Sequence, residues 1–152
     1  MRRFASKLAA LRGDKIEWAP GEIRGVIHGP LPNKSNSRKI VHVRGRMLVI
    51  KEQAALDFLE AFDAAAQAGQ APKFLSGMDA VKWGGIRYSL TATVYQANLR
   101  RDLDIELLCD ALQKSGVIAN DRAIWEKHSR REIDRENPRT EFVVRPIQEK
   151  VS

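Results

Sequence analysis

The sequence has few of the residues that build disulfide frameworks and zinc sites. Its 152 residues include one cysteine, Cys109, so no disulfide can form within the chain. Cys109 lies in the apolar stretch LLCDAL, which is typical of an inert thiol in a protein core. The three histidines, at positions 28, 42 and 128, lack the spacing of metal ligands. This composition excludes a Cys/His zinc framework, and it fits a cytoplasmic location, which we expect.

Long hydrophobic runs are also missing. No stretch of about 18 apolar residues occurs, so we expect no membrane span and no membrane partner. The basic start, MRRFASKLAALRGDK, has an apolar part that is broken by Lys7 and is too short for a secretory signal. We therefore expect residues 1–20 to be an N-terminal extension and residues 21–152 to form the functional domain.

Positive charge is the clearest feature of the composition. Lys and Arg number 26 against 19 for Asp and Glu, which gives a formal net charge of +7. Such an excess favours a polyanionic partner, of which nucleic acid is one. Hydrophobic residues make up 43% of the chain, so we expect a folded domain with its own core.

Hydrophobic periodicity divides the chain into helices and strands. The clearest helix is KEQAALDFLEAFDAAAQAG, residues 51–69, because its apolar residues recur three and four positions apart. A second helix is predicted at 105–116, with Asp104 placed to cap its start and Gly116 to end it. Alternation and β-forming residues predict strands at 22–29, 39–50 (a hairpin turning near Gly45), 80–95 and 140–147.

The remaining segments are loops or ambiguous. Residues 30–39, PLPNKSNSRK, are expected to form a loop, whereas the pattern in 123–140 does not separate helix from strand. The order of strands, helix, strand, helix and strand predicts the fold class. We expect a single α+β domain in which helices pack on a mixed β-sheet.

Two aspartates in RRDLD, Asp102 and Asp104, are the strongest candidates for a functional site. If the strand at 80–95 continues to Asp104, both side chains point to one face, with their Cα atoms about 6.6 Å apart. The chain that follows the second helix can bring Asp121 back beside them. Three carboxylates in such a group are suited to Mg²⁺, for which Mn²⁺ could substitute. A metal there would polarise a phosphoryl oxygen and activate a water molecule.

Cations close to these carboxylates could bind nucleic-acid phosphates. Arg100 and Arg101 can hold phosphate oxygens bidentately. Weaker candidates for DNA contact lie in the 33–39 loop, namely Lys34, Asn36 and Arg38.

A structural interpretation of the acids stays open beside the metal site. Asp104 could be only a helix cap, and Asp102 only an ion-pair partner of the neighbouring arginines. Glu106 is interpreted as an acid of the first helical turn, and Asp110 as a structural or ion-paired residue.

With these motifs in this order, the chain resembles the RusA family of Holliday junction resolvases. That family has a Pro-rich S-N loop, a G-R and a helix; then come a basic run, D-L-D-N, a helix with D-A-L, a glycine and an aspartate. The resemblance covers roughly residues 25–147. The matching pieces are PLPNKSN (30–36), RGRMLVI (44–50), KEQAALDF (51–58), RRDLD (100–104), DALQKSG (110–116) and IANDRAI (118–124).

The resemblance implies a RusA-like nuclease fold and a homodimer. It implies a Mg²⁺-dependent endonuclease that resolves four-way DNA junctions by paired cuts during recombination and repair. The family's metal-binding aspartates correspond to Asp102, Asp104 and Asp121, so the resemblance and the spacing select the same three catalytic residues.

Two positions depart from the family pattern. Ile105 stands where the family has asparagine, and Leu108 stands where it has a lysine tied to catalysis. The interval between Asp104 and Asp110 is also about two residues short. Loss of the lysine removes a cation that could stabilise developing phosphate charge, unless Lys34, Lys82 or Lys114 replaces it. Three alternatives therefore stay open: a catalytically impaired junction-binding protein, a nuclease of relaxed specificity, and a basic protein whose acids form a surface ion cluster.

Overall fold

A mixed β-sheet forms the centre of the structure, which is a computed structural model describing residues 13–19, 21–34, 38–69, 87–118 and 120–147. Its five strands are β1 (Lys15–Ala19), β2 (Glu22–His28), β7 (Arg139–Pro146), β5 (Tyr88–Gln96) and β6 (Ile124–Ile133), in that spatial order. β5 and β6 run parallel, and every other neighbouring pair is antiparallel.

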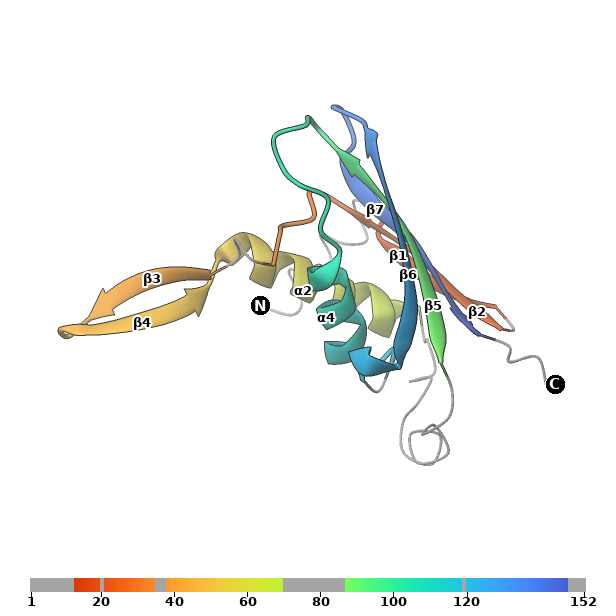
Figure 1. The fold of residues 1–152 in the computed structure, drawn as a ribbon, viewed down its shortest axis with the longest axis horizontal. Helices are drawn as coiled ribbons and strands as arrows, with labels where there is room; N and C mark the ends of the chain where they lie inside the picture. The colour runs from red at the N-terminus through yellow and green to blue at the C-terminus, as the bar shows by residue number, and fades with distance from the viewer. Residues whose placement is uncertain (1–12, 20, 35–37, 70–86, 119, 148–152) are drawn as a thin grey trace.

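Two helices cover one face of this sheet (Figure 1). They are α2 (Gln53–Ala68) and α4 (Glu106–Lys114). Their apolar residues meet those of the central strands, and the Phe62 ring of α2 stacks on the Phe142 ring of β7 with centroids 5.4 Å apart. Tyr88, Leu90, Ala92 and Val94 alternate along β5 and are all buried. The core therefore lies between the helix pair and the inner face of the sheet.

Two glycines lie where close packing requires the absence of a side chain. A Cβ atom added to Gly25 in β2 would lie 2.3 Å from Cζ of Phe142. A Cβ added to Gly69, directly after α2, would lie 2.2 Å from the backbone oxygen of Ile16. Both distances are far below van der Waals contact, so neither position has room for a side chain.

A separate hairpin is made of β3 (Arg38–Val43) and β4 (Arg46–Lys51). It forms its own two-stranded sheet and stands out from the body beyond the start of α2 (Figure 1). The predicted hairpin that turns near Gly45 is therefore confirmed.

The parallel pair β5 and β6 is connected through α4. A parallel connection must carry the chain back across the sheet, and a helix usually does so. The loop before α4 consequently lies at the end where β5 finishes, and residues 120–123 lie at the end where β6 begins. The nine residues of α4, about 13.5 Å at the usual helical rise, separate the two ends.

The predicted fold class is confirmed, since the structure is a single α+β domain with a mixed sheet and helices packed on it. The helix predicted at 51–69 is α2, and the last predicted strand is β7. Part of the expected extension is a strand, because residues 15–19 form β1 and pair with β2. The ambiguous segment 123–140 contains β6 and the first residues of β7. Of the strand predicted at 80–95, residues 80–86 lie outside the described residues. No helix in the described ranges is long and apolar enough to cross a membrane.

Candidate functional site

The loop between β5 and α4 carries Asp102 and Asp104. β5 ends at Gln96, and residues 97–105 form neither strand nor helix. The strand therefore does not continue to Asp104, and the Cα spacing that depended on this condition does not apply. Asn98 helps to turn the chain away from the sheet, because its side-chain oxygen accepts a hydrogen bond from the backbone N–H of Arg100 at 2.9 Å.

Arg100, Arg101 and Asp102 line a cleft of about 380 Å³. All three residues are exposed, and the loop that carries them is tied to β6 by a hydrogen bond from Arg131 Nη1 to the carbonyl oxygen of Arg101. The remaining wall comes from the loop after β2 and the start of α2, namely Pro32, Asn33, Glu52 and Ala54. Two arginines and two acids, Asp102 and Glu52, thus border the same cleft. The arginines suit a phosphate-bearing ligand.

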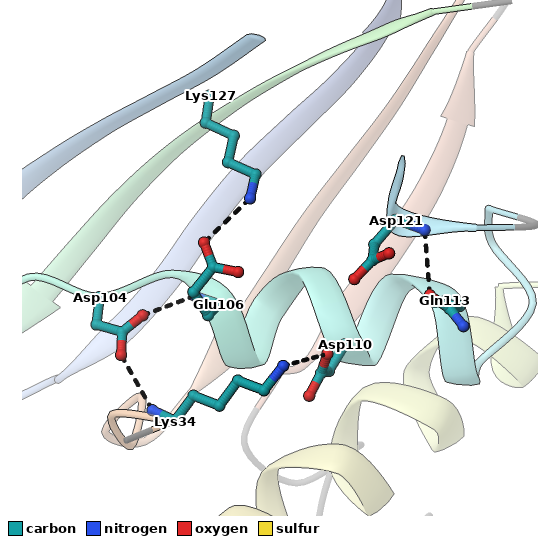
Figure 2. Close-up of polar contacts among 7 residues, drawn as sticks. All are labelled: Lys34, Asp104, Glu106, Asp110, Gln113, Asp121 and Lys127. Carbon is teal, nitrogen blue, oxygen red and sulfur yellow. Dashed lines mark hydrogen bonds and ion pairs between the residues drawn. The ribbon is translucent and has the colours of Figure 1, made fainter. Parts of the chain in front are cut away.

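Asp104 connects two backbone segments at the start of α4 (Figure 2). Its Oδ1 accepts a hydrogen bond from the backbone N–H of Glu106 at 2.9 Å, and its Oδ2 accepts one from the backbone N–H of Lys34 at 3.1 Å. The sequence predicts that Asp104 is the N-cap residue of this helix. The helix begins at Glu106, so the N-cap position belongs to Ile105 and Asp104 lies one residue before it. The carboxylate still satisfies a backbone N–H group that the helix leaves free.

Lys34, expected as a DNA contact, places its ammonium group beside α4 (Figure 2). Its Nζ lies 3.1 Å from Oδ1 of Asp110, and the two side chains are 39% and 16% exposed. This ion pair agrees with the interpretation of Asp110 as an ion-paired residue. Two other residues of this loop are expected from the sequence to contact DNA. Asn36 lies outside the described residues, and Arg38 is the first residue of β3 rather than part of the loop.

Asp121 lies near the other end of α4, as Figure 2 shows. It opens a short 3₁₀ helix (Asp121–Ala123), and its backbone N–H donates to Oε1 of Gln113 at 3.1 Å. Asn120 caps that turn by accepting a hydrogen bond from the backbone N–H of Arg122. The structure therefore does not bring Asp121 beside Asp104, since α4 lies between them.

Lys127 of β6 is a cation that the sequence pattern did not single out. Its Nζ lies 3.0 Å from Oε1 of Glu106, the first residue of α4. Burial lowers the pKa of Lys127, but the hydrogen bond to Glu106 and the negative charges of Glu106 and Asp121 outweigh it, so the pKa is raised. Lys127 thus remains charged beside Glu106 at the start of α4.

Leu108, at the position of the family lysine, is fully buried in the core. Lys114 is exposed in the last turn of α4, and Lys82 lies outside the described residues. Cys109 is buried beside Leu108, and burial raises the pKa of its thiol to about 11. The thiol is therefore neutral at physiological pH, as expected for an inert core cysteine.

The described residues contain no group of three or more His, Cys, Asp and Glu side chains that could hold a metal ion. The three-carboxylate site remains a prediction. A smaller donor set fits the chemistry better, because Mg²⁺ is commonly held by one or two carboxylates together with water and substrate phosphate. Asp102 and Asp104, on one loop beside the arginine-lined cleft, provide two such carboxylates.

No family model matches this sequence, and a search of curated proteins finds no match. The resemblance to junction resolvases therefore depends on the order and spacing of the motifs.

Proposed function

We propose that the chain is a Mg²⁺-dependent, structure-selective DNA endonuclease that acts as a homodimer and cuts four-way junctions by paired phosphodiester hydrolysis. A cytoplasmic location fits this role. The observation that carries the proposal is the shared cleft of Arg100, Arg101 and Asp102. The RusA-like order of motifs supports the choice of DNA junctions as the substrate.

Each residue has a role that follows from its position. Arg100 and Arg101 bind the phosphates that flank the cut, since guanidinium groups match phosphate oxygens in charge and geometry. Asp102 and Asp104 hold the metal, whereas Asp121, near the other end of α4, has no assigned role in this site. Bound Mg²⁺ would supply a Lewis acid for the phosphoryl oxygen and a more acidic water molecule. Asp104 also fixes the loop through its bonds to the backbone of Lys34 and Glu106.

A second candidate is a junction-binding protein that has lost cleavage. It is favoured by the burial of Leu108, which provides no cation, and by the pairing of Lys34 with Asp110. The separation of Asp121 from Asp104 points the same way. This protein would keep the salt-dependent affinity that phosphate contacts produce.

One gel separates these functions. The purified protein is incubated with a labelled four-way junction or a matched linear duplex, with Mg²⁺ or with EDTA. Asp102→Asn is compared with Asp63→Asn, which removes the same charge from α2. We expect paired nicks in the junction that require Mg²⁺, disappear in Asp102→Asn and persist in Asp63→Asn. Asp102→Asn should still bind the junction, at least as tightly as the unchanged chain, because a repelling charge is gone.

The other outcomes point elsewhere. Retarded junction without product at any Mg²⁺ concentration would establish the binding protein. Equal cutting of the linear duplex would indicate a nuclease of relaxed specificity. Normal cutting by Asp102→Asn would refute the assigned site.

A further inference from the structure

The β3–β4 hairpin is strongly basic. Residues 38–51, RKIVHVRGRMLVIK, contain five Lys and Arg residues and no acid. The side chains of Arg44 and Arg46 are exposed at its tip, and neither has an ion-pair partner among the described residues. The hairpin therefore presents uncompensated positive charge at the point farthest from the body (Figure 1).

The turn of the hairpin holds an arginine in an unfavourable backbone conformation. Val43 pairs with Arg46, so Arg44 and Gly45 form a two-residue connection, and their φ angles are +51° and +77°. Such turns need positive φ at both central residues and favour asparagine, aspartate or glycine at the first. Arg44 occupies the first of these positions although arginine is less suited to positive φ than asparagine, aspartate or glycine. This choice indicates that its guanidinium group has a function.

The hairpin also exposes large apolar side chains that the rest of the described chain leaves uncovered. Ile40 and Met47 are 61% and 68% exposed, and Val43 and Leu48 are 48% and 45% exposed. The register places Ile40, His42 and Met47 on one face and Val41, Val43 and Leu48 on the other. A lone two-stranded ribbon is only marginally stable in water, so this one needs a partner.

We propose that the β3–β4 hairpin is a ribbon that lies in the major groove of duplex nucleic acid. Its six register pairs make it about 20 Å long, and the major groove, about 12 Å wide, admits a two-stranded ribbon. Exposed apolar side chains can contact thymine methyl groups there, while the arginines reach phosphates and base edges. Charge argues against a second copy as the partner, because two ribbons without acids would repel each other.

The ribbon is continuous with the proposed site. Glu52 follows β4 directly and lines the same cleft as Arg100, Arg101 and Asp102. DNA that passes over this cleft can thus extend along the hairpin. This inference rests on the proposed function only because it takes DNA as the partner of the hairpin. Its test therefore measures DNA binding under conditions in which no cleavage is expected.

The experiment compares two double variants in EDTA, with a labelled duplex and a labelled four-way junction, over a range of salt concentrations. Arg44→Asn/Arg46→Thr removes two cations from the ribbon, and its asparagine suits the turn. Arg130→Gln/Arg135→Gln removes two exposed cations from β6 and the turn that follows it. Both variants lower the net charge from +7 to +5 (7 − 2), so the total change in charge is matched while its location differs. Arg130 is ion-paired with Glu132, whereas Arg44 and Arg46 have no ion-pair partner among the described residues.

We expect the ribbon variant to flatten the slope of log affinity against log salt by about 1.8, which is two contacts at about 0.9 each. The control variant should keep the slope of the unchanged chain. Equal slopes in both variants would overturn the proposal that the hairpin lies in the major groove. A second pair of results would also overturn it: the ribbon variant keeps the salt slope of the unchanged chain, and the protein forms a dimer without DNA in sedimentation equilibrium. That dimer would have to become a monomer in Met47→Thr, which would show that the hairpin binds a second copy. Ribbon-dependent binding in EDTA, together with no cleavage of the junction when Mg²⁺ is supplied, would refute the nuclease alone.

Discussion

Replacement of Asp104 tests whether one carboxylate holds the start of α4 to the loop after β2. Its two oxygens accept hydrogen bonds from the backbone N–H groups of Glu106 and Lys34, at 2.9 and 3.1 Å. Asp104→Asn keeps one acceptor oxygen but turns an amide NH₂ toward the other N–H, so one bond is lost. Asp104→Ala loses both bonds and leaves the two segments unconnected at this point.

The expected cost follows from the number of bonds lost. A hydrogen bond of this kind contributes about 1 kcal/mol net, because water competes for partly exposed groups. Removal of a side chain that caps a helix start costs a similar amount, about 1 kcal/mol. We therefore expect Asp104→Asn to lower the free energy of unfolding by about 1 kcal/mol and Asp104→Ala by about 2 kcal/mol.

Urea unfolding followed by circular dichroism measures both values, provided that the slope with urea is unchanged. Asp102→Asn is the matched control, because it alters an exposed aspartate two residues earlier on the same loop. Its free energy of unfolding should stay within about 0.5 kcal/mol of the unchanged chain. If Asp104→Ala were as stable as this control, the two bonds would not hold the loop, and the structural role of Asp104 would be refuted.

Three further predictions concern the core and the acids around α4. Gly25→Ala should lower the free energy of unfolding by about 2–3 kcal/mol, because its Cβ would meet the buried, stacked ring of Phe142; an unchanged urea midpoint would contradict this packing. Folding holds the Cys109 proton more tightly, so the contribution of this thiol to the free energy of unfolding should be constant below about pH 9 and should decline as pH rises toward about 11. Cys109→Ala should show a shallower decline over that window, and an identical one would refute it. Lys127→Gln should change stability by less than about 1 kcal/mol, since its ion pair with Glu106 is partly exposed. If the nuclease proposal holds, it should slow junction cutting while binding in EDTA is retained; normal cutting would exclude Lys127 from the site.

The fold class could be predicted from the sequence because the apolar residues of most helices and strands recur at regular spacings. The apolar residues of α2 and the alternating residues of β5 each point to one buried face. β6 carries no such signal, since Ile124 is its only buried residue among ten. An edge strand with polar residues on both faces has no apolar alternation, so the pattern of 123–140 could not reveal it.

The candidate site was only partly predictable, because its contacts join distant segments. Arg100, Arg101 and Asp102 are neighbours in the sequence, and the structure places them on one cleft. The bond between Lys34 and Asp104 spans 70 residues, and the one between Lys127 and Glu106 spans 21. Neither follows from spacing, since each depends on how strands and helices pack. The position of Asp121 was misjudged for the same reason, because the parallel connection places it at the far end of α4.

The packing of α4 explains why the cation beside Glu106 is Lys127 of β6 and not a lysine of α4 itself. Leu107, Leu108, Cys109, Ala111 and Leu112 are all buried, so the helix has core contacts around most of its circumference. A lysine at position 108 would face apolar neighbours and would lose its hydration without a partner. Lys127 avoids this cost because it reaches α4 from β6, the exposed edge strand, and meets Glu106 at the start of the helix. Leu108 therefore strengthens the core, while the charge beside the acids is supplied across the sheet edge.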